Sequence, residues 1–222
     1  MSLIQVENLK KNYRQGQIIV KALRGISFKI DQGEFTAIVG PSGSGKTTLL
    51  NIIGVLDEPD EGTVKLNRQD LTKLKKSEKT KFRLNEIGFV FQFYNLIPVF
   101  TALENVEYLL MLQGVSKKER RDRSIALLTE MGMGDLIKRF PKELSGGQQQ
   151  RVAVARALVS QPKVVLADEP TANLDSESAD NLLDIMQEMC EKKHITFLFS
   201  THDQRVMNRA KRLIKMRDGH IA

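Results

Sequence analysis

FTAIVGPSGSGKT, residues 35–47, is the stretch of this chain that decides its fold class. A short apolar run comes first, and the order G-x-x-x-x-G-K-T follows, with its fixed residues at Gly40, Gly45, Lys46 and Thr47. Small residues at these spacings let a backbone bend tightly and turn several N–H groups toward one anion. The sequence therefore predicts a phosphate-binding loop between a strand and a helix.

The members of this loop have separate roles in holding a nucleotide. Lys46 adds a point charge for the outer phosphates, and Thr47 can lend its hydroxyl to a magnesium ion. A helix expected over residues 48–55 points the positive end of its dipole at the same phosphates. A Gly- and Ser-rich surface turn is the alternative, but the order of strand, loop, Lys-Thr and apolar helix argues against it. The expected nucleotide contacts are Gly40, Pro41, Ser42, Gly43, Ser44, Gly45, Lys46, Thr47 and Thr48.

A second apolar run, residues 164–167, ends in the acids Asp168 and Glu169. A phosphate-loop enzyme needs a carboxylate at the end of a second strand to organise magnesium. Adjacent side chains at a strand end diverge, so we expect Asp168 to serve the metal and Glu169 to face a water beside the γ-phosphate. The alternative is a solvent-exposed pair that caps the segment before Pro170.

Composition limits the cellular setting. The chain has 222 residues, 41% of them hydrophobic, which suits one globular domain, and its net charge is +7. The Lys and Arg residues are spread along the chain, which favours a solvated surface over specific nucleic-acid binding. The lone Cys190 has no disulfide partner and fits a reducing compartment. No apolar run approaches a membrane span, and the N-terminus reads as a strand rather than a secretory signal. We therefore expect a cytoplasmic protein.

Short apolar strands alternate with amphipathic segments, which predicts an α/β fold with a mostly parallel core sheet. The early strands alternate polar and apolar residues instead, which predicts an antiparallel β layer beside that core. Residues 101–141 change to helical spacing and predict an inserted α-helical subdomain. The expected strands are residues 4–9, 26–30, 35–39, 87–91, 163–167 and 195–199.

The segment Leu144-Ser145-Gly146-Gly147-Gln148 resembles the signature of the ATP-binding-cassette (ABC) ATPases. Ser145 and the glycines can present a hydroxyl and open backbone N–H groups at a helix start, which makes a second anion-binding terminus. The resemblance implies a P-loop NTPase (ABC ATPase) fold in a single domain, 1–222. Its core and antiparallel layer would cover about 1–92 and 162–222, and its helical subdomain about 93–161.

The resemblance also implies a homodimer with ATP at the interface. Two subunits would associate head to tail, so that Ser145, Gly146, Gly147 and Gln148 of one face the nucleotide held by the phosphate loop of the other. Asp175, in Asn173-Leu174-Asp175, would link the opposed sites across the interface. A helix N-cap is the other interpretation of Asp175, and the two are compatible.

Three further residues match family motifs in order along the chain. Tyr13 resembles the aromatic that stacks on adenine, Gln92 the residue that contacts magnesium and the attacking water, and His202 the switch residue that reaches the γ-phosphate. Their alternatives are simple packing, a surface amide and a structural histidine. The resemblance thus implies an ATPase that uses ATP and Mg2+, with the catalytic set Lys46, Gln92, Glu169 and His202 and the metal set Thr47, Gln92 and Asp168.

The string FVFQFYNLIP, residues 89–98, followed by LENV, residues 103–106, resembles the MacB and lipoprotein-release (LolD) type of cassette. This implies an integral membrane permease subunit as partner, either MacB/LolCE-like or FtsX-like, and a peripheral position on the inner face of the cytoplasmic membrane. The ATPase would then drive export, efflux or lipoprotein release. FtsE-like mechanotransmission and a soluble DNA- or ribosome-associated role are the alternatives. Residues 93–100 could dock the partner or pack beneath the helices.

Overall fold

The computed structural model describes residues 2–222 and builds them into two sheets and seven α-helices. Met1, with which the expected domain begins, lies outside the described residues. The strands are β1 (Ser2–Gln15), β2 (Ile18–Asp31), β3 (Phe35–Val39), β4 (Glu61–Leu66), β5 (Gln69–Asp70), β6 (Ile87–Val90), β7 (Val164–Asp168), β8 (Thr196–Thr201), β9 (Arg212–Arg217) and β10 (His220–Ile221). The helices are α1 (Lys46–Ile53), α2 (Lys76–Glu86), α3 (Ala102–Leu112), α4 (Lys117–Glu130), α5 (Gly146–Leu158), α6 (Ser176–Lys193) and α7 (Gln204–Arg209).

The central sheet has the strand order β10-β9-β3-β8-β7-β6, and only the β10–β9 pair is antiparallel. Its inner strands are buried on both faces. In β8, Phe197 and Phe199 belong to the core on the helical side, whereas Leu198 belongs to the core on the other side. Because both faces are covered, these strands are continuous apolar runs rather than alternating ones. The predicted parallel core is confirmed.

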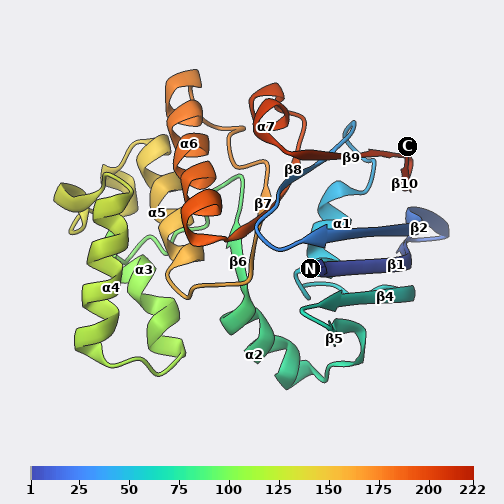
Figure 1. The fold of residues 1–222 in the computed structure, drawn as a ribbon, viewed down its shortest axis with the longest axis horizontal. Coiled ribbons are helices and arrows are strands. Elements are labelled where there is room, and N and C mark those ends of the chain that lie inside the picture. Colours follow the sequence, from blue (N-terminus) through green and yellow to red (C-terminus); the bar gives the residue numbers. More distant parts are fainter. Residues whose placement is uncertain (1) are drawn as a thin grey trace.

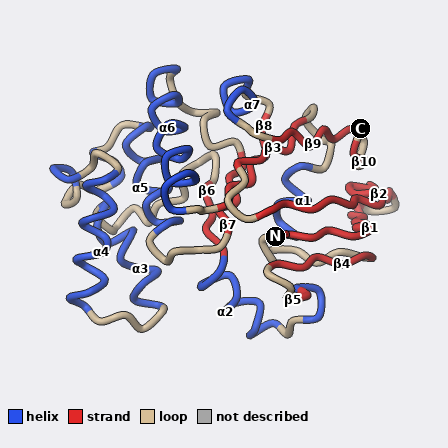
Figure 2. Tube along the Cα trace, viewed as in Figure 1, coloured by secondary structure: helices blue, strands red, loops and turns tan. Residues whose placement is uncertain are grey.

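The second sheet, in the order β2-β1-β4-β5, is antiparallel throughout. It packs with α1 against one face of the central sheet, while α3, α4, α5 and α6 cover the other face (Figure 1). Figure 2 shows α3, α4, α5 and α6 gathered on one side of the molecule and most of the strands on the other. The predicted antiparallel layer is therefore present as well. No helix of the described residues has the length and apolar character needed to cross a bilayer.

The structure extends or adds several elements. β1 and β2 are 14 residues each, much longer than the predicted 4–9 and 26–30, because cross-strand pairing continues through polar residues. The helix α2 was not predicted, because Phe82 is its one buried residue and its sequence has no apolar periodicity.

The predicted helical subdomain, residues 93–161, contains α3, α4 and α5. Thr101 begins α3 with a capping box, in which its side chain accepts from Glu104 N–H and its own N–H donates to the Glu104 carboxylate. Leu103, Val106 and Leu110 form the buried face of this helix. The division of the chain at residues 93 and 161 stays a prediction.

Candidate active site

The phosphate loop is held in shape by backbone from both sheets. Gly45 has φ 100°, and a Cβ there would lie 2.5 Å from the carbonyl oxygen of Ala22 in β2. A Cβ at Gly40 would lie 2.1 Å from the Met216 carbonyl oxygen in β9, and Gly219 N–H donates to Ser44 O at 3.2 Å. These close approaches explain why the loop requires glycine at Gly40 and Gly45.

The loop fits a phosphate group. Lys46 is only 8% exposed, and its ammonium donates to the carbonyl oxygens of Gly40 and Pro41 at 2.8 and 3.1 Å. The hydroxyl of Ser44 is buried and has no hydrogen-bond partner within the described structure. A cation held at the centre of the loop, with the start of α1 directly behind it, is an arrangement that can bind a phosphate oxygen.

Thr47 and Asp168 are brought together from α1 and the end of β7. Thr47 Oγ1 lies 3.3 and 3.2 Å from the two carboxylate oxygens of Asp168. A hydroxyl and a carboxylate are hard oxygen ligands of the kind that Mg2+ takes, together with water and substrate phosphates. Gln92, which follows β6, lines the same cleft. These three side chains could therefore hold the metal.

Glu169 turns away from Asp168, as expected for adjacent acids. Its backbone has φ 47°, and its N–H donates to Ser200 O at 2.9 Å, so the chain bends directly after β7. The carboxylate accepts a hydrogen bond from Thr201 Oγ1 at 3.1 Å, and its other oxygen lies 2.7 Å from His202 Nδ1. A positive φ at a non-glycine residue is uncommon and often accompanies functional sites. The bend sends the two acids in different directions.

Most of these groups line one open cleft of about 600 Å³, although Asp168 is not among its lining residues. Of the predicted residues, the cleft is lined by Tyr13, Ser42, Gly43, Gly45, Lys46, Thr47, Thr48, Gln92, Glu169 and His202. The prediction missed Val20, Lys21 and Ala22 of β2, together with Ala172 and Ser200. The three β2 residues lay outside the predicted strand, although Val20 pairs directly with Tyr13 across the hairpin. The hairpin formed by β1 and β2 therefore contributes one wall of the site.

Tyr13 lines the cleft and is also anchored at its hydroxyl. The Tyr13 OH donates to Asp57 Oδ2 at 2.6 Å, and Lys11 Nζ lies 5.1 Å from the centre of the ring. Burial and the hydrogen bond to Asp57 raise the pKa of Tyr13. The anchored ring is a flat apolar surface at the cleft wall that can stack on a base.

The predicted signature segment lies apart from this cleft. Ser145 caps α5: its Oγ accepts from Gln148 N–H at 3.3 Å, and its own N–H donates to Gln148 Oε1 at 2.9 Å. A Cβ at Gly146 would lie 2.8 Å from the Tyr94 hydroxyl. Ser145, Gly146, Gly147 and Gln148 are not among the residues that line the cleft. One chain therefore has two separate helix starts that could bind anions.

Asp203, which no sequence pattern indicated, joins the loops that follow β7 and β8. Its carboxylate accepts hydrogen bonds from Thr171 Oγ1 at 2.6 Å and from the Arg205 guanidinium at 2.8 Å. Burial alone would raise the pKa of Asp203, but the bonds from Arg205 and Thr171 outweigh burial and lower it to about 2.

Asp175 is an N-cap, since its side chain accepts from Ser178 N–H at 2.9 Å in the first turn of α6.

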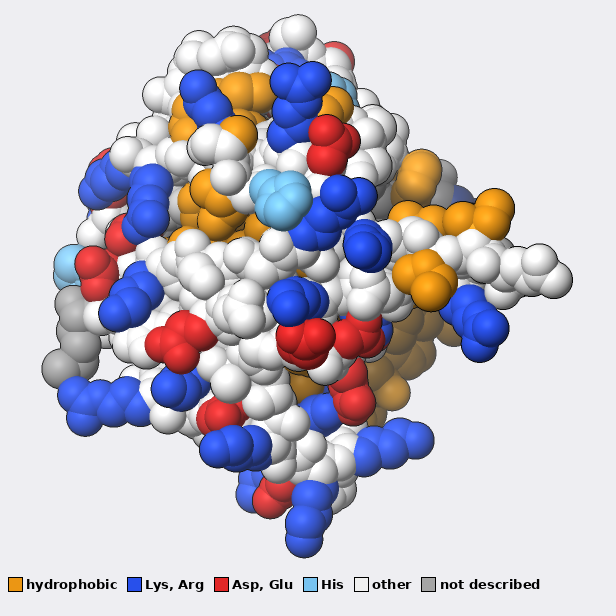
Figure 3. Space-filling model, turned by 90° about the vertical axis from the view of Figure 1, so that its right-hand side faces the viewer, with side chains coloured by type: hydrophobic (Ala, Val, Ile, Leu, Met, Phe, Trp, Pro, Cys, Tyr) orange, Lys and Arg blue, Asp and Glu red, His pale blue; other side chains and the backbone are white. Residues whose placement is uncertain are grey.

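One face of the molecule carries both kinds of charge. On the face shown in Figure 3, Lys and Arg side chains are scattered among acidic ones rather than gathered in one basic patch. Between the site and α3, the side chains of Phe93 and Val99 are 72% and 74% exposed. The segment 93–100 thus presents apolar side chains to solvent in addition to packing beneath the helices.

Comparisons with known proteins cover most or all of the chain. The family model described as ABC transporter matches residues 23–172. The macrolide export ATP-binding/permease protein MacB of Syntrophobacter fumaroxidans is 46% identical over 223 residues, which are 100% of this chain and 31% of that protein. The lipoprotein-releasing system ATP-binding protein LolD of Syntrophus aciditrophicus is 45% identical over 99% of this chain and 98% of LolD.

A solved dimeric structure of an ATP-binding cassette, in a post-hydrolysis state bound to ADP and Pi, has a TM-score of 0.92 and 42% identity. The match covers 99% of this chain and 96% of that one. The chain thus spans less than a third of the MacB relative but nearly the whole of LolD and of this solved cassette.

Proposed function

The chain belongs to the ABC transporter family and is an ATPase cassette, and from this premise we propose that two copies of it enclose ATP and drive a separate membrane subunit. One observation carries the proposal. The phosphate loop, Thr47 and the Glu169–His202 pair share a cleft, Asp168 contacts Thr47, and the signature segment lies outside the cleft. A second chain can supply the missing segment.

In the proposed reaction, Lys46 exchanges its two loop carbonyl partners for phosphate oxygens of ATP. Glu169 accepts a proton from the water that attacks the terminal phosphorus, which gives ADP and phosphate. His202 contacts the Glu169 carboxylate through Nδ1, so Nδ1 carries the hydrogen. In the imidazolium form, in which both ring nitrogens carry hydrogens, Nε2 would donate to a γ-phosphate oxygen. Thr47, Gln92 and Asp168 would hold Mg2+, which supplies charge neutralisation of the phosphates when bound.

The placement of Ser145 supports the proposed dimer. Ser145, at the start of α5, offers a hydroxyl and nearby backbone N–H groups to an anion, but it does not line the cleft of its own chain. In a head-to-tail pair, Ser145 would face the γ-phosphate bound by the partner. Loss of that phosphate on hydrolysis would remove a contact that both chains share, and the pair would reopen.

The membrane partner is proposed from the relatives. MacB is named as an ATP-binding/permease protein, and LolD is named as the ATP-binding protein of a releasing system. A permease subunit beside this chain would place it at the inner face of the cytoplasmic membrane. The exposed Phe93 and Val99 are apolar side chains that a helix of such a partner could cover.

Co-purification from membranes of the native source tests this proposal. The tagged chain is recovered in mild detergent, and the proteins that accompany it are identified by mass spectrometry. The expected result is a stoichiometric integral membrane protein, whose recovery falls in a Phe93→Ser, Val99→Ser variant but not in an Ile221→Ser control, since Ile221 is exposed in β10. Recovery with ribosomes or DNA alone would contradict the membrane assignment.

A further inference from the structure

A second cavity of about 520 Å³ lies at the opposite ends of the strands that lead to the nucleotide cleft. Lys163 and Ile195, which line this cavity, directly precede β7 and β8. Asp168 and Thr201 end the same two strands at the catalytic side. At about 3.3 Å per residue, the two sites are separated by the length of a five- or six-residue strand. The cavity is thus distinct from the active site.

The floor of this cavity is apolar. It is formed where the C-terminal ends of α4, α5 and α6 meet the starts of β7 and β8. Pockets of this volume with apolar floors and a few convergent polar groups are the usual form of small-molecule sites. The apolar lining residues are Ala126, Leu127, Leu158, Val159, Pro162, Met189 and Ile195.

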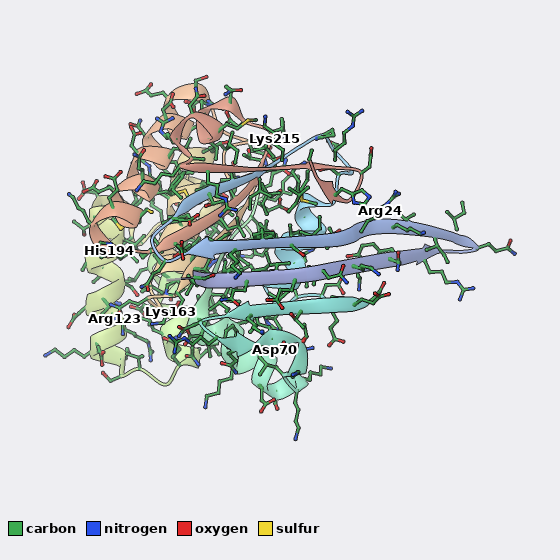
Figure 4. The ribbon with its side chains drawn as sticks, turned by 45° about the vertical axis from the view of Figure 1, so that its right-hand side comes forward. Arg24, Asp70, Arg123, Lys163, His194 and Lys215 are labelled. Carbon is green, nitrogen blue, oxygen red and sulfur yellow. The ribbon has the colours of Figure 1, made fainter. Side chains whose placement is uncertain are left out.

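The rim is basic. Arg123, Lys163, Lys193 and His194 line the cavity, against a single acid, Glu130. Lys193 Nζ lies 2.6 Å from the Glu130 carboxylate, so the acid is already neutralised within the protein. Figure 4 shows Arg123, Lys163 and His194 at the same end of the molecule, far from Arg24. The charge that remains for an incoming ligand is positive.

Contacts within the protein explain the positions of some of these basic side chains but not of all. Cations near the C-terminal ends of helices stabilise the helix dipole, which explains Lys193 at the end of α6. Arg123 similarly donates to the carbonyl oxygen of Val159, the C-cap of α5, at 2.9 Å, and its Nη1 lies 3.6 Å from the Glu119 carboxylate. Lys163 precedes a strand instead of ending a helix. Its ammonium makes no ion pair or hydrogen bond to any residue that the structure describes.

We propose that this cavity binds a small amphiphilic anion, with the apolar chain or ring on the floor and the carboxylate, sulfonate or phosphate at Lys163 and Arg123. Charge complementarity selects the class of ligand, because the one acid of the rim is paired and the Lys163 ammonium is not. The apolar floor selects for a hydrophobic body, because burying it removes apolar surface from water. A simple inorganic anion would leave that floor uncovered.

The experiment uses anilinonaphthalene sulfonate, whose fluorescence rises in apolar sites, as the probe. The full chain is titrated with saturating ADP, so that the nucleotide cleft is filled. We expect one saturable class of sites, from which decanoate displaces the probe and decanol, the uncharged chain of the same length, does so at least tenfold less well. Displacement of the probe by benzoate as well as by decanoate would also support the proposal, and it would show that the cavity binds anions with an aromatic ring.

Three variants locate the site. Lys163→Gln should raise the Kd of the probe about five- to tenfold, while Lys118→Gln, at the exposed far end of α4, should leave it unchanged. Ala126→Phe, which fills the cavity from an exposed position, should abolish saturable binding. Unchanged ADP affinity and melting temperature show that each variant is folded. Equal displacement by decanol and decanoate, or equal effects of Lys163→Gln and Lys118→Gln, would overturn the proposal.

Discussion

His202 Nδ1 lies 2.7 Å from Glu169 Oε1, and this contact joins the ends of β7 and β8 at the floor of the nucleotide cleft. Thr201 Oγ1 holds the other carboxylate oxygen at 3.1 Å, so the Glu169 side chain is fixed from two sides. A carboxylate fixed in this way can keep one lone pair directed at a water molecule, which is what a general base requires.

Glu169→Gln should retain ATP binding and lose hydrolysis by about 10²- to 10⁴-fold, because the amide still accepts hydrogen bonds but cannot take a proton. The ATP-bound pair should then accumulate and elute as a dimer in size-exclusion chromatography. The control is Glu177→Gln, an exposed acid in the first turn of α6. Hydrolysis by Glu169→Gln at the rate of the unaltered chain would show that Glu169 is not the base.

Mixing two inactive variants tests the composite site. In a head-to-tail pair of Lys46→Met with Ser145→Ala, one of the two sites keeps both Lys46 and Ser145. A 1:1 mixture should therefore recover up to about a quarter of the activity of the unaltered chain, measured as phosphate release, while each variant alone is nearly inactive. If the mixture shows only the mean of the separate activities, the two residues act within one chain.

Two variants of Tyr13 distinguish the stacking of its ring on adenine from the anchoring of its hydroxyl by Asp57. Tyr13→Leu should weaken ATP binding about five- to tenfold, because the stacking of flat rings is lost. Tyr13→Phe keeps the ring and removes the bond to Asp57, so ATP affinity should change by less than about twofold while stability falls by about 1 kcal/mol. Titration calorimetry and urea unfolding measure the two effects. Equal loss of affinity in both variants would assign the role to the hydroxyl.

Gly45→Ala should destabilise the chain by more than about 2 kcal/mol and abolish ATP binding, since its Cβ would meet the Ala22 carbonyl at a left-handed φ of 100°. The matched control is Gly33→Ala, which also has positive φ, at 73°, but no atom within 4 Å of the added Cβ. This control should cost only about 1–2 kcal/mol and preserve binding. Similar losses in urea unfolding would show that crowding by Ala22 is unimportant.

The lowered pKa of Asp203 predicts a pH-dependent contribution to stability. Because the folded pKa, about 2, lies below the ordinary 3.8, the contribution is present above pH 4 and is lost as the pH falls toward 2. Asp203→Asn should therefore cost roughly 1 to 2 kcal/mol at pH 7 after allowance for solvent screening, and progressively less at pH 4 and pH 3. Urea unfolding of both proteins measures this difference. A cost independent of pH would assign it to geometry rather than charge.

The sequence predicted those parts of the fold and site whose chemistry depends on local spacing. The order of residues in the phosphate loop and the apolar run before Asp168 are local patterns, so their strands and helix were placed to within one or two residues. The cassette fold and the ATPase activity are confirmed. The roles of the individual site residues remain predictions, although the structure brings most of them into one cleft.

The parts that were missed depend on contacts between distant segments. Val20 reaches the cleft because β2 pairs with β1 through several register shifts, which no periodicity in the sequence reveals. Asp203 looks like an ordinary surface acid until Thr171 is brought beside it by the pairing of β7 and β8. Such residues are defined by the packing of elements, and a single sequence carries no direct record of that packing.

The contacts of the phosphate loop with Met216 and Gly219 have a consequence for biosynthesis. The ribosome makes the loop early, but the backbone that braces Gly40 and Ser44 is translated near residue 219. A nascent chain that has not yet produced β9 and β10 therefore lacks the backbone that contacts this loop at Gly40 and Ser44. We therefore expect ATP binding to be acquired only after translation has passed these strands, so that a prematurely released chain does not enter the ATP-dependent pair with complete copies.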